Sequence, residues 1–209
     1  MTCSLLNNVN PFTPRVYNMG GEPAAQLETS NRVSNLEETA SSRTLHMGKS
    51  FSFKTDMVRL PSGRVTSRDI VDHPGAVAVV AVDGPEIVMV RQYRYAAGRE
   101  LLEIPAGTLE RSEDPDACAA RELREETGYV AKTWRRLLRC YMAPGYSSEV
   151  IHFYVAEGLE PVGSSPEEDE SITVERVTFD AALRMIEDNT IVDAKTVAGV
   201  LSYLTRASP

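Results

Sequence analysis

Hydrophobic residues occur in short runs between residues 49 and 206, and turn-forming residues separate the runs. The segment from Gly75 to Val82 is continuously apolar, which is typical of a buried strand. Asp83-Gly84-Pro85 predicts a turn, and Glu86 to Tyr93 then predicts a second central strand. By the same reasoning, further strands are expected at residues 51–60, 65–71, 100–104, 134–142, 150–156 and 172–177.

Three segments have the pattern of amphipathic helices. Asp114-Pro115 favours a helix start, because Asp is a good N-cap and proline at the first helical position loses no hydrogen bond. Gly128 favours the end of that helix. Two more helices are predicted from Phe179 to Asp188 and from Asp193 to Arg206. Mixed strands with helices on both sides predict an α/β fold of the α/β/α sandwich type.

The polar and apolar patterns also divide the chain. Residues 1–48 are rich in Asn, Ser, Thr, Glu and Gly without a sustained period, and we expect a flexible N-terminal tail there. Residues 49–72 are expected to form a small N-terminal β-strand extension. Residues 73–209 are expected to form the main domain.

Composition narrows the class of protein. The 209 residues are 42% hydrophobic and 25% charged, as in soluble globular proteins. A formal net charge of -8 argues against general binding to nucleic acid or membrane surfaces. Three cysteines, without metal-ligand spacing, fit a reducing compartment, and no apolar run has membrane-spanning length. A cytoplasmic location is therefore expected.

The segment GTLERSEDPDACAARELREETGY, from Gly107 to Tyr129, carries the chemistry. On the predicted helix Glu122, Glu125 and Glu126 share one face, while Ala120 and Leu123 are expected to face the core. Stacked carboxylates repel one another unless a cation lies between them. Carboxylate oxygens select Mg²⁺ or Mn²⁺ over zinc. The alternative is a solvated helix face with Arg121–Glu125 ion pairs. This alternative is less favoured, because Gly107, Glu113 and Gly128 all occur at the spacing of the motif.

This segment resembles the Nudix box without a mismatch, with Tyr129 in the last bulky apolar position. The resemblance implies the Nudix fold and metal-dependent hydrolysis of a nucleoside diphosphate linked to another group. It also implies metal ligation by Glu122, Glu126 and the Ala106 carbonyl, with help from Glu125. Arg121 is then expected to hold the helix carboxylates in place.

The runs HPGAVAVV and IVMVRQYRYAAGRELLEIPAG are similar to the ADP-ribose pyrophosphatase branch of that family, as are Pro144 and the segment 191–196. This similarity implies hydrolysis of ADP-ribose to AMP and ribose 5-phosphate. Arg94 matches an arginine that contacts the substrate diphosphate, and a guanidinium suits phosphate oxygens. Arg68 matches a second substrate arginine, although Arg59, Arg64 and Arg91 are nearby in the sequence.

The acidic segment 167–170 corresponds to the loop that carries a water-activating glutamate in that branch. Glu168 is the first candidate and Glu170 the second, with a solvated acidic turn as the alternative. The resemblance further implies a homodimer in which the strands of residues 49–72 are exchanged. An aromatic residue of that extension, Phe53 or Phe51, would then stack on adenine.

Several other functions remain open from the sequence. Within the same chemistry, the substrate could be GDP-mannose, another nucleotide sugar, or a dinucleotide such as NADH or FAD. A protein that binds ADP-ribose without cleaving it is a different class, although the intact box and the lack of a basic helix-turn-helix pattern argue against it. A further interaction role for the N-terminal tail is also open.

Overall fold

The computed structural model describes residues 36–163 and 171–207. Within them, a mixed sheet of seven strands has the order β10-β5-β4-β9-β8, with β6 paired to β5 and β7 paired to β4. Strands β4 and β9 run parallel, and the other neighbours run antiparallel. The strands are β4 (Ala76–Asp83), β5 (Glu86–Arg94), β6 (Arg99–Glu103), β7 (Ala106–Thr108), β8 (Tyr129–Tyr141), β9 (Val150–Pro161) and β10 (Ile172–Thr178).

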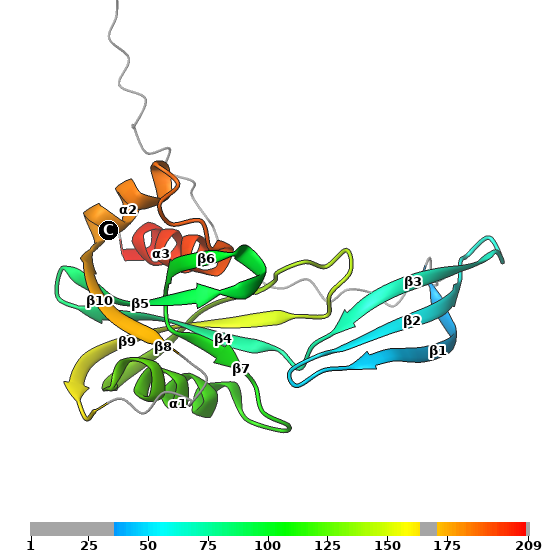
Figure 1. Ribbon diagram of the computed structural model, residues 1–209, viewed down its shortest axis with the longest axis horizontal. Coiled ribbons are helices and arrows are strands. Elements are labelled where there is room, and N and C mark those ends of the chain that lie inside the picture. The colour runs from blue at the N-terminus through cyan, green and yellow to red at the C-terminus, as the bar shows by residue number, and fades with distance from the viewer. Residues whose placement is uncertain (1–35, 164–170, 208–209) are drawn as a thin grey trace, which may run out of the picture. The chain divides into compact units, whose positions relative to one another are not determined.

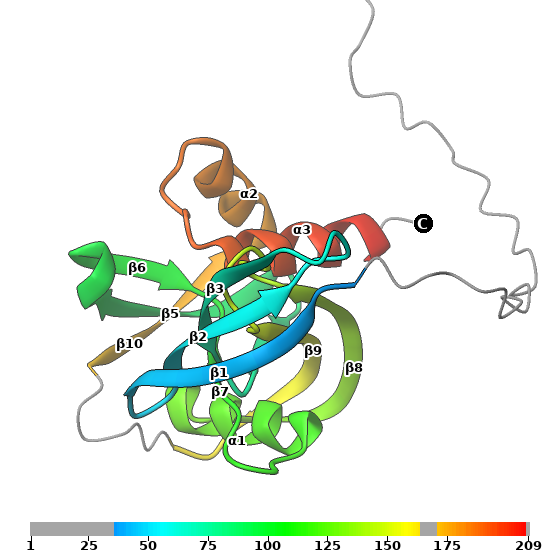
Figure 2. The same cartoon turned by 90° about the vertical axis from the view of Figure 1, so that its right-hand side faces the viewer.

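Helices cover both faces of this sheet. Helix α1 (Pro115–Thr127) lies on one face, and α2 (Phe179–Glu187) and α3 (Ala194–Ala207) lie on the other (Figures 1 and 2). A short 3-10 helix, η1 (Tyr95–Ala97), connects β5 to β6. The predicted α/β/α sandwich with a mixed sheet is confirmed.

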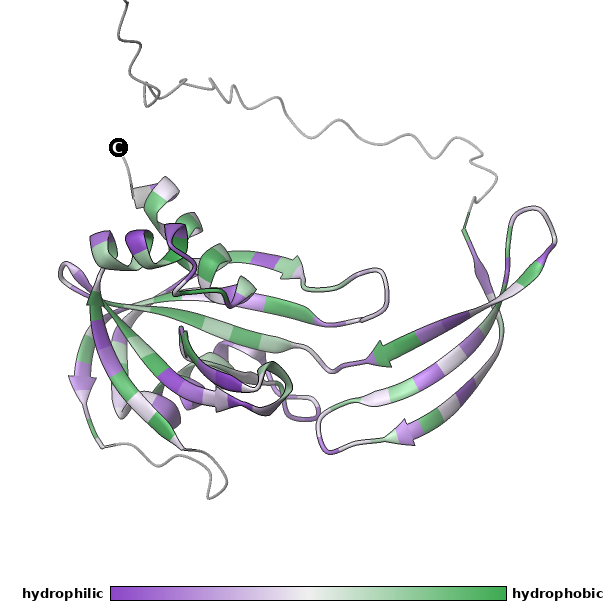
Figure 3. Cartoon of the chain, turned by 45° about the horizontal axis from the view of Figure 1, so that its top comes forward, coloured by the Kyte–Doolittle hydropathy of each residue, from purple (hydrophilic) through white to green (hydrophobic). Residues whose placement is uncertain are grey.

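The sequence of β4 is apolar without alternation because other residues cover both of its faces. Val77, Val79 and Ala81 pack in the cluster that contains Leu123 of α1. Ala78 and its neighbours at alternate positions pack in the second cluster, beneath α2 and α3. Because both faces of the strand are covered, every position from Ala76 to Val82 is buried. The hydropathy colouring shows the same strand as apolar over most of its length (Figure 3).

Helix α1 begins and ends where its sequence predicts. The Asp114 side chain accepts a hydrogen bond from the Asp116 N–H at 2.8 Å, and Pro115 follows as the first helical residue. Gly128 ends the helix with a φ of 73°. The expectation that Ala120 faces the core was wrong, because Ala120 is exposed. The core-facing residues of α1 are Cys118, Ala119 and Leu123, all fully buried.

A separate three-stranded antiparallel sheet consists of β1 (Glu38–Met47), β2 (Ser52–Arg59) and β3 (Val65–Asp72). The last two strands match the predicted extension. Strand β1 corrects the predicted boundary, because Glu38–Met47 lies within the range assigned to a tail. All ten of its residues are exposed, so burial imposes no hydrophobic period on it. Residues 1–35 lie outside the described residues.

Thr196 in the first turn of α3 joins this helix to the sheet. Its side chain is fully buried, its Oγ1 accepts from the Ile104 N–H at 3.0 Å, and it donates to Asp193 Oδ2 at 2.6 Å. We expect Thr196→Val to lower the free energy of unfolding by about 2 kcal/mol, because the buried Ile104 N–H loses its acceptor. Urea denaturation measures this loss. Thr196→Ser keeps the hydroxyl and is the control; a valine variant as stable as the serine variant would contradict the assignment.

Candidate active site

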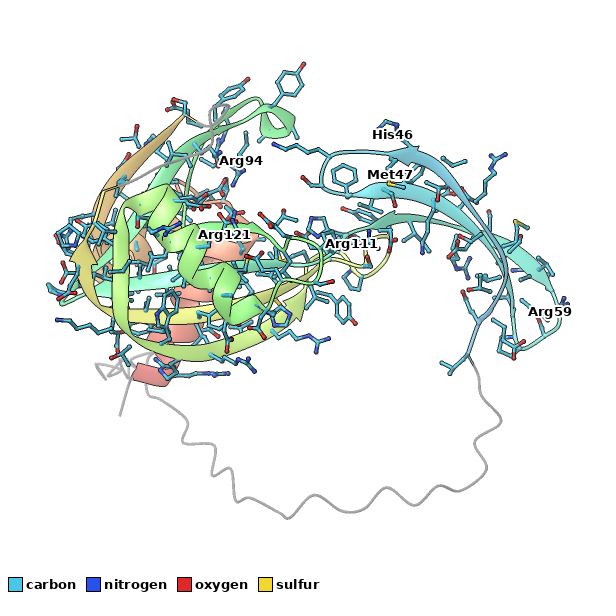
Figure 4. The ribbon with its side chains drawn as sticks, turned by 90° about the horizontal axis from the view of Figure 1, so that it is seen from below. His46, Met47, Arg59, Arg94, Arg111 and Arg121 are labelled. Carbon is cyan, nitrogen blue, oxygen red and sulfur yellow. The ribbon has the colours of Figure 1, made fainter. Side chains whose placement is uncertain are left out.

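A cavity of about 470 Å³ opens beside α1 and the strands β4, β5 and β7. Its wall contains acidic and basic side chains from α1, β5 and α3. Figure 4 labels Arg94 of β5 and Arg121 of α1, both of which line it. The lining residues used below are Arg94, Ala106, Gly107, Arg121, Glu122, Glu125, Glu149 and Lys195.

The predicted metal ligands are gathered here. Ala106, Glu122 and Glu125 line the cavity. Glu126 lies deeper, with 4% of its surface exposed, and its Oε2 accepts a hydrogen bond from the Ala106 N–H at 2.9 Å. Helical spacing therefore brings Glu122, Glu125 and Glu126 to the strand β7 that carries the predicted carbonyl ligand.

Gly107 allows this close approach of helix to strand. A Cβ added at Gly107 would lie 2.0 Å from Glu122 Oε1 and from its carboxyl carbon. Real Cβ atoms essentially never come within 3.0 Å of another heavy atom. A larger residue at this position would therefore displace the Glu122 carboxylate.

Arg121 connects the acidic residues of the motif. Its Nη1 donates to Glu122 at 2.7 Å and to Glu125 at 3.2 Å, while its Nε and Nη2 each donate to Glu113 at 2.9 Å. The hydrogen bond to Glu113 is the main cause of the raised pKa of Arg121. The same hydrogen bond, more than any other contact, lowers the pKa of Glu113 to about 2. The positive charge of Arg121 offsets part of the repulsion between Glu122 and Glu125.

The donor set fits a hard divalent cation. It consists of carboxylate oxygens and a backbone carbonyl, which are the ligands that Mg²⁺ and Mn²⁺ prefer. Within residues 36–163 and 171–207, however, no three His, Cys, Asp or Glu residues form a complete metal-binding group as placed. The hydrogen bonds of Glu122 and Glu125 to Arg121 account for part of their present orientation.

Arg94 lines the cavity, and its guanidinium group is held by the buried carboxylate of Glu103. Its Nε and Nη2 donate to the two carboxylate oxygens of Glu103 at 2.8 and 2.6 Å. Glu103 is only 1% exposed and also forms an ion pair with Lys195. Burial acts to raise the pKa of Glu103, but the hydrogen bond from Arg94 and the charge of Lys195 outweigh burial, and the pKa is lowered. The pKa of Arg94 is raised, chiefly by its hydrogen bond to Glu103.

The structure adds cavity residues that sequence reasoning missed. Glu149, five residues after Pro144, lies 3.9 Å from His73 Nε2 through its Oε1. Lys195 lies in the segment 191–196, which was noted only as a resemblance. The sequence offered one indication for each residue: Glu149 follows Pro144 closely, and Lys195 lies within the segment 191–196. Neither residue has a local sequence pattern that predicts a place in a cavity.

Other predicted residues lie elsewhere. Arg68, on β3, forms an ion pair with Glu37 at 2.5 Å and is outside the cavity lining. Phe53, on β2, is 37% exposed and is also outside the lining of the single chain. Glu168 and Glu170 lie outside the described residues. In the described part of the chain, the helices are too short or too polar to cross a membrane.

Comparison with known proteins identifies the family. The NUDIX domain model matches residues 72–199. An ADP-ribose pyrophosphatase of Bacillus subtilis (strain 168) is 42% identical over 171 residues, covering 80% of this chain and 92% of that protein. An ADP-ribose pyrophosphatase of Mycobacterium tuberculosis (strain ATCC 25618 / H37Rv) is 44% identical over 169 residues, covering 79% and 82%.

Two further similarities extend the comparison. The methanol dehydrogenase activator of Bacillus methanolicus is 42% identical over 167 residues, covering 78% of this chain and 90% of that protein. A crystal structure of an ADP compounds hydrolase has a TM-score of 0.73 at 20% identity, covering 84% of this chain and 96% of that chain, which supports the fold. This chain therefore belongs to the Nudix family and, within it, to the ADP-ribose pyrophosphatase branch.

Proposed function

We propose that the protein hydrolyses the diphosphate of ADP-ribose. Water forms a bond to one phosphorus, the bridging P–O bond breaks, and the products are AMP and ribose 5-phosphate. The observation that carries the proposal is the cavity in which Glu122 of α1 meets Gly107, with Arg94 on the same wall. Two relatives of more than 40% identity are named ADP-ribose pyrophosphatases, which supports this substrate over GDP-mannose, NADH or FAD.

The proposed cofactor is Mg²⁺, with Mn²⁺ as a substitute. Glu122, Glu126 and the Ala106 carbonyl would hold it, and Glu125 would assist. When bound, the cation supplies positive charge to the diphosphate and lowers the pKa of the attacking water. The hydrogen bond from the Ala106 N–H to Glu126 Oε2 supports this ligand set, because it places the Glu126 carboxylate beside the residue whose carbonyl would be a ligand.

Side chains of this protein would bind the diphosphate, hold the metal ligands and position the attacking water. The Arg94 guanidinium binds diphosphate oxygens, since its planar fork matches phosphate geometry. Arg121 holds Glu122 and Glu125 in place through hydrogen bonds from its Nη1. A carboxylate of the segment 167–170, Glu168 first and Glu170 second, positions the attacking water in line with the breaking bond.

We also propose a cytoplasmic homodimer in which residues 49–72 are exchanged. Arg68 and Phe53, which lie outside the lining of their own chain's cavity, would then contribute to the partner's cavity. Sedimentation with a simultaneous activity assay tests this arrangement. A fully active monomer would exclude the exchange.

Product analysis in the presence and absence of metal tests the function. We expect equal amounts of AMP and ribose 5-phosphate from ADP-ribose with Mg²⁺, because one bond breaks per turnover. Chelation by EDTA should reduce AMP release to the rate without protein, and added Mg²⁺ should restore it. Tight ADP-ribose binding without any AMP would instead indicate a sensor.

A further inference from the structure

A group of charges around the buried Glu103 connects α3 to the cavity. Glu103 ends β6 and is 1% exposed, yet it holds two cations, Arg94 from β5 and Lys195 from α3. Lys195 Nζ also donates to Asp193 Oδ2 at 3.0 Å. Arg94 and Lys195 both line the cavity, whereas Glu103 and Asp193 do not. Glu103 and Asp193 therefore hold two cationic side chains at the cavity wall.

The position of Lys195 is fixed from two sides. Asp193 is itself held by the Thr196 N–H at 3.0 Å and by the Thr196 hydroxyl at 2.6 Å. Thr196 Oγ1 in turn accepts from the Ile104 N–H, next to Glu103. The Lys195 side chain is only 12% exposed, so little freedom remains for it to lose on binding a ligand.

Each of the two cations has donors beyond those that Glu103 and Asp193 accept from. Glu103 contacts Arg94 along the Nε and Nη2 edge, so the Nη1 edge of the guanidinium points away from Glu103. An ammonium group has three donors, and the two carboxylates account for two of those of Lys195. Anionic oxygens in the cavity therefore have cationic donors from both β5 and α3 within the same wall.

We propose that Lys195 is a substrate-binding residue that, beside Arg94, contacts the anionic oxygens of the diphosphate, and that Glu103 is the positioning residue for both cations. This inference rests on the proposed function only in taking the ligand to be a nucleoside diphosphate.

A simpler role would have Lys195 do no more than neutralise buried Glu103. The two roles differ in a double-mutant cycle. If Lys195 acts only through Glu103, then removing Lys195 from a Glu103→Gln protein has no effect on ligand binding. If Lys195 contacts the ligand, the same removal weakens binding in both backgrounds.

The test measures the Kd of ADP with Mg²⁺ by calorimetry, and the kcat and KM of ADP-ribose, for Lys195→Met, Glu103→Gln and the double variant. We expect Lys195→Met to raise the Kd of ADP and the KM about tenfold in both backgrounds, with a smaller change in kcat. Lys195→Arg keeps the charge and should recover part of the affinity. An unchanged Kd on adding Lys195→Met to Glu103→Gln would overturn the proposal.

Lys132→Met is the matched control. Lys132 is 66% exposed, pairs with Glu160 and lies outside the cavity lining, so its removal should leave the Kd unchanged. Thermal melting of each variant shows whether it remains folded at the assay temperature. A wild-type protein that binds ADP but leaves ADP-ribose intact would overturn the proposed function, while the ADP cycle would still decide the role of Lys195. A wild-type protein that neither binds ADP nor hydrolyses ADP-ribose would overturn both.

Discussion

The Glu126→Gln variant is expected to hydrolyse ADP-ribose about a thousandfold more slowly than wild type at saturating substrate. Glutamine has nearly the same volume, and its amide oxygen can still accept the hydrogen bond that the Ala106 N–H donates to Glu126. The substitution removes the negative charge on which the proposed cation site depends. The kcat from AMP release measures the effect, and calorimetric titration with Mn²⁺ should show weaker metal binding.

A second glutamate separates this effect from a general loss of charge. Glu160 on β9 is 55% exposed, pairs with Lys132 and lies outside the cavity lining. Glu160→Gln should therefore leave kcat unchanged. A near-normal kcat for a folded Glu126→Gln protein would refute the role of Glu126 in metal binding.

The Gly107→Ala variant is expected to lose about a hundredfold in kcat, the second largest effect among these substitutions. The added Cβ would lie 2.0 Å from the Glu122 carboxylate, so this side chain, the strand or both must shift by about an ångström. Such a shift changes the position of Glu122 relative to the other proposed ligands. Steady-state kinetics with ADP-ribose and Mg²⁺ measure the loss.

Gly145→Ala is the matched control for the glycine. An added Cβ at Gly145 has no heavy atom within 4 Å, and its φ is not in the left-handed region. We expect normal kcat and melting temperature for this variant in the same assay. If Gly107→Ala were equally active, the close contact between β7 and α1 would have no bearing on catalysis.

The sequence predicted the sandwich because its elements are strongly patterned. The apolar run of β4 and the capping residues Asp114 and Gly128 each depend on local physics that the structure retains. Strand β1 was missed because all its residues are exposed and its pairing with β2 leaves no periodic signal. Strand β7, with three residues, is too short to have a pattern of its own.

The motif residues of the cavity were predictable because helical spacing places them together. Glu103 and Lys195 were not, because they are 92 residues apart and meet only when α3 packs beside the end of β6. The orientation of α1 was predicted incompletely for a similar reason. Ala119 and Ala120 both lie about one helical turn before Leu123, so spacing alone does not distinguish them. The packing of α1 against β4 decides that Ala119 is the one that is buried.

Comparing kcat/KM for ADP-ribose and GDP-mannose in one AMP- and GMP-detecting assay with Mg²⁺ tests the central claim most directly. We predict a kcat/KM at least about tenfold higher for ADP-ribose, and no cleavage of either compound in EDTA. A higher kcat/KM for GDP-mannose would contradict the substrate while retaining the chemistry. Cleavage that persists in EDTA would contradict the metal-dependent mechanism itself.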